Sequence, residues 1–185
     1  NKFSIRRFIF VGDRGLFSKA NLKELRGENK AGEFIVGMKL AVFKKRHDEF
    51  YDIGRYQWIN GDLAVYETTH ENDRCIITWS RSRAQRDRKA REDVLDKIRQ
   101  KLSKKKITAK EFVTNTTYKR YVVGLNGNKQ FTLNEKAIAQ DATRDGYFGV
   151  VTNVTDMAAK EIVENYKTLW IVEDAFGEIK GTLKA

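Results

Sequence analysis

The chain opens with an apolar strand, a helix and a second apolar strand. Residues 8–11 are four consecutive apolar positions, too few for a helix and rich in strand formers, which predicts a buried strand. Ser18 can cap a helix that extends to about residue 26, where Gly27 stands at the expected C-cap position. Residues 33–40 then predict a second strand. This strand–helix–strand order is typical of an α/β fold with a parallel sheet.

The middle of the chain has a different pattern. Residues 51–59 and 63–69 flank Asn60-Gly61, which predicts an antiparallel hairpin with a type I′ turn. Further strands are predicted in a set of short alternating or apolar segments, 74–79, 118–125 and 129–132. Together with the hairpin they indicate a β-rich insertion.

The α/β pattern returns at the end, with a helix over 134–142, an apolar strand over 146–152 and a long helix over 156–183. We therefore expect three segments. Residues 1–40 form the first part of an α/β core, 41–132 the β-rich insertion, and 133–185 the second part of the core.

A basic helix is predicted over residues 80–106, which contain twelve Lys and Arg and only four acids, a local net charge of +8. A narrow apolar stripe follows one side of it. Two interpretations stay open, a solvated helix face or a surface that contacts phosphates through residues such as Arg86, Arg88 and Lys89.

The whole chain has 36 Lys and Arg against 25 Asp and Glu, a net charge of +11, which favours a polyanionic partner such as nucleic acid or a membrane surface. There is no run of about 18 apolar residues, and because the start is charged and then predicts a short strand, we expect no signal peptide there. The single cysteine, Cys75, fits a reducing compartment, so we expect a cytoplasmic protein.

Two carboxylates stand where chemistry is expected. Asp13 follows the first apolar strand directly, and the carboxyl ends of parallel strands are where open α/β sheets bind ligands. The alternative is an Asx turn that closes the strand. In the last helix, Glu173 and Lys180 project within about 40° of Tyr166 on the inward apolar side. Charges there indicate either a structural ion pair or rim position, or a metal-ligating Glu with a Lys that reaches phosphate.

These residues resemble a known family. The segment YKTLWIVEDAFGEIKGTLK has Tyr166, Glu173 and Lys180 at the spacings of the signature found in bacterial DDE transposases of the insertion-sequence-four group, namely Tyr, two residues, Arg, three residues, Glu, six residues and Lys. Leu169 stands at the Arg position, which is a departure. The segments FVGDRGLFSKANLKEL, RSRAQRDRKARE and DGYFGVVTN are similar to the family's second-Asp segment, basic helix and final core strand.

The resemblance implies a ribonuclease H-like core whose first strands precede this chain. It also implies two-metal catalysis, with two Mg²⁺ ions (Mn²⁺ as a substitute) held by two Asp and one Glu. Asp13 and Glu173 would be two of these ligands, and the first Asp would lie upstream of Asn1. The resemblance and the charge pattern together suggest a set of DNA-contacting residues, Tyr166, Lys180, Arg14, Arg86, Arg88 and Lys89.

The expected function of the parent protein is cut-and-paste DNA transposition in a bacterial, nucleoid-associated setting, by strand cleavage and strand transfer on double-stranded DNA. We expect this chain alone to be inactive and to have a tendency to form homodimers through an open sheet edge. Two alternatives are a non-catalytic DNA-binding module that uses the basic helix, and a transposase remnant that acts only as a structural or interaction domain.

Overall fold

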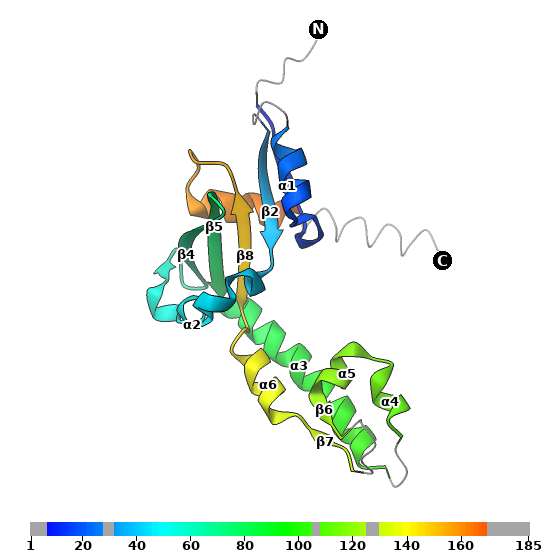
Figure 1. Cartoon of the computed structure of the whole chain (residues 1–185). Coiled ribbons are helices and arrows are strands. Elements are labelled where there is room, and N and C mark those ends of the chain that lie inside the picture. The colour runs from blue at the N-terminus through cyan, green and yellow to red at the C-terminus, as the bar shows by residue number, and fades with distance from the viewer. Residues whose placement is uncertain (1–6, 28–31, 105–107, 125–129, 170–185) are drawn as a thin grey trace, which may run out of the picture. The chain divides into compact units, whose positions relative to one another are not determined.

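The computed structural model describes residues 7–27, 32–104, 108–124 and 130–169 (Figure 1). It is a mixed α/β protein made of two compact units. The first, here called the sheet unit, takes in residues 1–79 and 148–185; the second, the helical unit, is residues 80–147.

One six-stranded sheet organises the sheet unit, in the order β1-β2-β8-β5-β4-β3. Its strands are β1 (Ile9–Gly12), β2 (Glu33–Met38), β3 (Gln57–Trp58), β4 (Leu63–His70), β5 (Asp73–Ser80) and β8 (Tyr147–Thr152). The predicted parallel pairing of the first two strands is confirmed, since β1 and β2 are parallel, whereas β2 with β8 and β3 with β4 are antiparallel. The strands of the middle segment therefore extend the same sheet.

Short helices connect these strands. They are η1 (Arg14–Leu16), α1 (Lys19–Arg26), η2 (Leu40–Arg46), α2 (His47–Phe50) and η3 (Ile53–Arg55). A further helix over residues 159–169 follows β8. The predicted caps of α1 are confirmed. The Ser18 hydroxyl accepts a hydrogen bond from the Asn21 amide at 3.1 Å, and Gly27 has a φ of 67°, which a glycine adopts without steric cost.

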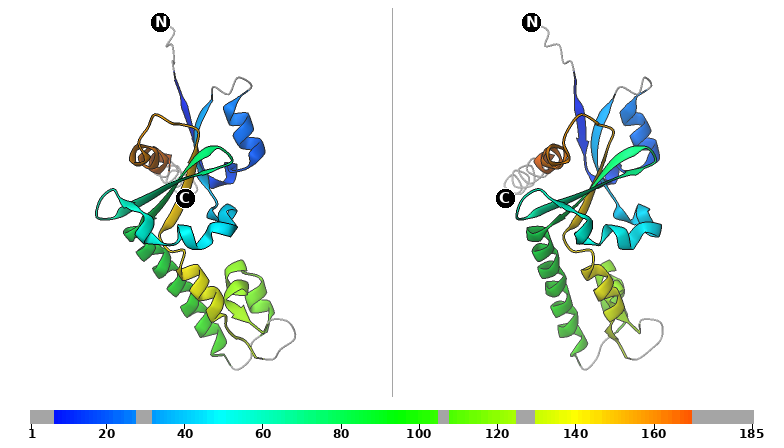
Figure 2. Two further views of the ribbon diagram at one scale, coloured as in Figure 1. Left: turned by 60° about the vertical axis from the view of Figure 1, so that its left-hand side comes forward. Right: turned by 90° about the vertical axis from the view of Figure 1, so that its left-hand side faces the viewer.

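Helices cover both faces of the sheet (Figure 2). The helix over 159–169 packs through the fully buried Ile162 and Val163 on a face formed by residues that include Ile35 and Val150. On the other face α1 contacts β2, where the Arg26 guanidinium lies over the Phe34 ring. Each fully buried aliphatic side chain of this kind stabilises the fold by about 1.5–3 kcal/mol.

An ion-pair bridge fixes the start of β2 to the turn before the last described helix. The Arg7 guanidinium donates hydrogen bonds to the carboxylates of Glu33, at the start of β2, and Asp156, which precedes the helix over 159–169. The hydrogen bonds from Arg7 hold the pKa of Asp156 below its usual value.

The helical unit is inserted between β5 and β8. Its elements are α3 (Arg81–Leu102), α4 (Lys110–Val113), α5 (Thr116–Tyr121), β6 (Val122–Val123), β7 (Thr132–Leu133) and α6 (Glu135–Ala142). The basic helix predicted from the sequence is present as α3, and its apolar stripe, with Leu95 and Ile98 buried, packs against Phe112, Tyr121 and Val122. In the described part of the chain no helix combines the length and the apolarity needed to cross a bilayer.

The turn type predicted at Asn60-Gly61 is wrong, although the hairpin exists. Neither residue has a positive φ, and the Asn60 side chain instead accepts hydrogen bonds from the amides of Asp62 and Leu63 at 2.8 Å each. The turn with two positive φ angles joins β4 to β5 at Glu71 (50°) and Asn72 (72°). The dipeptide Asn-Gly favours a type I′ turn, but here the Asn side chain satisfies the loop amides in another conformation.

The strand predicted over 118–125 is also wrong for most of its length. Residues 116–121 form α5, and of the described residues of that segment only Val122 and Val123 are in a strand. Asn115 explains the difference, because its side chain accepts hydrogen bonds from the amides of Thr117 and Tyr118 and so starts a helix. The predicted helix and strand that follow are present as α6 and β8; the predicted helix over 156–183 is described for 159–169 only.

Asp141 should make the helical unit sensitive to acid. Its carboxylate is partly buried, which raises its pKa, but hydrogen bonds from the Arg120 guanidinium and the Tyr121 hydroxyl outweigh burial and lower it overall. A lowered folded-state pKa gives stability that is present above the usual value of 3.8 and is lost as pH falls through the folded-state value. We expect Asp141→Asn to cost about 1–2 kcal/mol at pH 7, because these hydrogen bonds are charge-assisted but partly exposed.

The measurement is thermal unfolding followed by circular dichroism between pH 7 and pH 2. The difference in melting temperature between the unmodified chain and Asp141→Asn should disappear at the lowest pH. Asp93→Asn is the matched control, because Asp93 is an exposed acid on α3 with no ion-pair partner among the described residues. A difference in melting temperature that stays unchanged at the lowest pH would contradict the proposal that the charged Asp141 carboxylate supplies this stability.

Candidate functional site

The carboxyl ends of β1 and β2 meet at one edge of the sheet because these strands are parallel, with Gly12 paired to Val36. Asp13 follows β1 directly and its side chain is exposed. Its Oδ1 accepts a hydrogen bond from the Gly15 amide at 2.8 Å, so the Asx turn considered from the sequence is present. A carboxylate has a second oxygen and further lone pairs, so the turn leaves ligand capacity at this position.

Tyr166 and the backbone of Arg14 both lie close to Gly37 of β2, beside this edge. A Cβ atom placed on Gly37 would lie 2.4 Å from the Tyr166 hydroxyl oxygen and 3.1 Å from the Arg14 backbone nitrogen. Because Gly37 has no side chain, the Tyr166 phenol occupies that space, next to Arg14. Tyr166 is buried, and its ring lies 4.9 Å from the Phe148 ring. The helix over 159–169 is thus fixed to β2 at the carboxyl end of the parallel pair.

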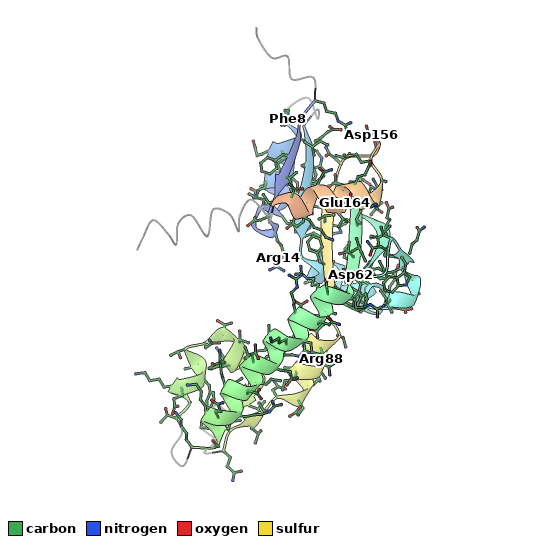
Figure 3. The ribbon with its side chains drawn as sticks, turned by 180° about the vertical axis from the view of Figure 1, so that it is seen from behind. Phe8, Arg14, Asp62, Arg88, Asp156 and Glu164 are labelled. Atoms are coloured by element: carbon green, nitrogen blue, oxygen red, sulfur yellow. The ribbon has the colours of Figure 1, made fainter. Side chains whose placement is uncertain are left out.

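The structure brings together Asp13, Arg14 and Tyr166 of the residues predicted for the strand-end site. Arg14 is exposed at this edge (Figure 3). Glu173 and Lys180, the other predicted members, lie outside the described residues. Among the described residues no group of three or more His, Cys, Asp or Glu is arranged to hold a metal ion.

Gly37 was not singled out from the sequence, although a signal for it exists. It stands inside the apolar strand segment EFIVGM, and a glycine in the interior of a strand often marks a place where another group approaches the backbone closely. The sequence alone does not identify the approaching group, because Tyr166 is 129 positions further along the chain.

The second candidate surface is formed by exposed cations of α3. Arg86, Arg88 and Lys89 are all exposed, and none of them forms an ion pair with a described residue (Figure 3 labels Arg88). Other arginines of the same helix are neutralised, as Arg91 is by Asp145 and Arg99 by Asp96. The three predicted phosphate-contacting residues are therefore available to a partner.

Comparison of the chain with protein-family models, with curated proteins and with solved structures gives no match. Its function is therefore inferred from the chemistry of the two surfaces described above.

Gly37→Ala should destabilise the protein by about 1–3 kcal/mol, because the added methyl group overlaps the Tyr166 hydroxyl in a packed core. Tyr166→Phe removes that oxygen, so the double variant should lose less stability than the sum of the two single variants. Urea unfolding of the four proteins measures this coupling.

Gly61→Ala is the control, because nothing lies within 4 Å of a Cβ at that position and its φ is not positive. It should change the free energy of unfolding little. Strictly additive effects of Gly37→Ala and Tyr166→Phe would contradict the close approach of the two residues.

Proposed function

We propose that this chain is the catalytic part of a DDE-type DNA transposase with a ribonuclease H-like core. The observation that carries the proposal is the close approach of Tyr166 to Gly37 beside Arg14, which fixes the helix over 159–169 at the strand end where Asp13 stands. A parallel strand pair joined through a helix, with helices on both faces of the sheet, also supports it.

Asp13 and Glu173 are the proposed metal ligands. Asp13 fits a hard cation, because it is an exposed carboxylate with oxygen ligands beyond the one that the Gly15 amide uses. Two bound Mg²⁺ ions, for which Mn²⁺ can substitute, would activate a water or 3′-hydroxyl and stabilise the leaving oxygen. Two carboxylates are too few for such a pair, so the proposal needs a third.

The proposed position of the third carboxylate is a strand that pairs with the open side of β1. Among the described strands β1 has a single neighbour, β2, and lies at one end of the sheet order. An apolar edge strand is a template for a further strand. We therefore propose that the first Asp lies on such a strand, upstream of Asn1. Without that strand, the open side of β1 favours pairing with a second copy of the chain.

The remaining residues of this site have proposed roles on the substrate, which is double-stranded DNA. The Arg14 guanidinium is exposed beside Asp13 and suits a phosphate near the metal ligands. Lys180 is assigned a phosphate contact by its spacing from Glu173. Tyr166 is buried in the described structure, which favours a role in holding its helix on the sheet, in addition to the DNA contact that the family resemblance implies.

A second candidate function is DNA binding without chemistry, in a transposase remnant. The exposed and unpaired Arg86, Arg88 and Lys89 favour it. Metal binding separates the two candidates, because a DNA-binding remnant needs no divalent cation at Asp13. Either function would place the protein in the cytoplasm with the nucleoid.

Iron-mediated cleavage of the polypeptide tests the metal site directly. Fe²⁺ that replaces Mg²⁺ generates hydroxyl radicals with ascorbate and peroxide, and these cut the chain near the bound ion. We expect fragments with ends near residues 13 and 173, suppressed by excess Mg²⁺ and by Asp13→Asn. Asn retains the oxygen that accepts the Gly15 amide, so this variant removes the charge and keeps the turn.

Asp52→Asn is the matched control for this experiment. Asp52 also starts a short helical turn, η3, and accepts a hydrogen bond from the Gly54 amide at 3.0 Å. Its replacement should leave the fragment pattern unchanged. The same cleavage pattern in Asp13→Asn as in the unmodified chain, or an absence of localised cleavage, would refute the proposed metal site.

Plasmid nicking tests the incomplete ligand set. We expect this chain to leave supercoiled plasmid intact with Mg²⁺ or Mn²⁺, because two carboxylates would supply too few oxygen ligands and too little negative charge to hold a second ion. Glu173→Gln serves as the comparison. Nicking by the unmodified chain that disappears in Glu173→Gln would show that the site is complete and that the upstream position of the first Asp is wrong.

A further inference from the structure

The positive charge of the protein is concentrated in the helical unit. Residues 80–147 contain 18 Lys and Arg and 8 Asp and Glu, a net charge of +10. The other 117 residues contain 18 Lys and Arg and 17 Asp and Glu, a net charge of +1. Nearly all of the excess of +11 therefore belongs to the unit that does not contain Asp13 or Tyr166.

Ion pairs inside the helical unit decide which of its cations are available. Five of its eight acids lie within ion-pair distance of an arginine. The pairs are Arg83 with Asp87, Arg91 with Asp145, Arg99 with Glu92 and Asp96, and Arg120 with Asp141. These acids are engaged by arginines, which leaves other cations of α3 without neutralising partners.

Three of the available cations share one side of α3, whereas Arg88 projects about 160° away from Arg86. Arg86, Lys89 and Lys97 are exposed, have no ion-pair partner among the described residues, and fall within about 80° of one another on a helix. That side is opposite Leu95, which faces the interior of the unit. Figure 2 shows α3 along one side of this unit, with α4, α5 and α6 on the other. The 22 residues of α3 give a rod about 33 Å long.

The aromatic residues of the helical unit argue against a single-stranded partner. Proteins that bind single strands stack bases on exposed aromatic side chains. None of the unit's aromatic side chains, all of which fall in its described part, is exposed: Phe112 and Tyr121 are buried, and Tyr118, Phe131 and Tyr147 are partly buried. A rigid array of cations without a stacking surface fits the regular phosphates of a duplex.

We propose that the helical unit is a separate DNA-holding module that binds duplex phosphates through Arg86, Lys89 and Lys97, independently of metal and of the strand-end site. The module supplies affinity without sequence preference, and the sheet unit supplies the chemistry. This inference rests on the proposed function only for the identity of the polyanion as duplex DNA.

The test is fluorescence anisotropy of a labelled duplex of about 20 base pairs, titrated with the full chain in EDTA over a series of NaCl concentrations. Each phosphate neutralised adds about −0.9 to the slope of log K against log salt. The triple variant Arg86→Ala, Lys89→Ala and Lys97→Ala should therefore bind more weakly, with a slope smaller in magnitude by about 2.7. Two duplexes of unrelated sequence should bind alike.

The matched control is Lys19→Ala, Lys23→Ala and Lys160→Ala, three exposed lysines of the sheet unit, which lowers the net charge by the same amount. It should leave the slope unchanged. An unchanged slope in the α3 variant, an equal change in both variants, or tighter binding of a single strand than of the duplex would overturn the inference.

Asp13→Asn distinguishes this inference from the proposed function. The variant should bind the duplex in EDTA as tightly as the unmodified chain, even though it loses iron-mediated cleavage at residue 13. Loss of duplex binding in EDTA or in Asp13→Asn would overturn the separate module. If duplex binding persists and localised iron cleavage is absent, the module stands and the catalytic proposal fails.

Discussion

The structure depends most on the burial of β2 on both faces and at both edges. Phe34, Ile35 and Val36 have no exposed surface, β1 and β8 pair with the two edges, and α1 and the helix over 159–169 pack on opposite faces. Because every neighbour of β2 is placed against it, a change in this strand shifts several elements together. The glycine at position 37 belongs to this constraint: it lets the Tyr166 phenol lie against the backbone, where any side chain would displace it.

Capping residues and apolar runs in the sequence correctly predicted several helices and strands of the sheet unit. Ser18 and Gly27 predicted both ends of α1, and the apolar run before Asp13 predicted β1 with its parallel partner. The same kind of signal misled at Asn60, whose side chain bonds to loop amides, and at residues 118–121, where the Asn115 cap outweighs the strand preference of Tyr118 and Tyr121. In both cases one short polar side chain selects among conformations of similar free energy.

Some residues of the candidate site could also be predicted from local sequence, and others could not. Asp13 and Arg14 follow from their position after a strand, and the cations of α3 follow from composition. The contact between Gly37 and Tyr166 depends on a tertiary approach across 129 positions of sequence, which no local pattern specifies. The selection of unpaired cations on α3 likewise needed the ion pairs of the folded unit, because Arg91 is paired with Asp145, 54 positions away in the sequence, whereas Arg86 has no ion-pair partner among the described residues.

The insertion of the helical unit between β5 and β8 has a consequence for the order of folding. β8 lies in the interior of the sheet, between β2 and β5, yet 66 residues of the helical unit, 81–146, separate it from β5 along the chain. Closing an unstructured loop of that length costs about 3–4 kcal/mol of conformational entropy. In the folded helical unit the Ser80 amide donates to the Gly146 carbonyl at 3.0 Å, and the Gly146 amide donates to Asp87. These bonds hold the two ends of the insertion together, so a helical unit that folds first delivers β8 beside β5 with the loop already closed, and the sheet then forms around a short connection.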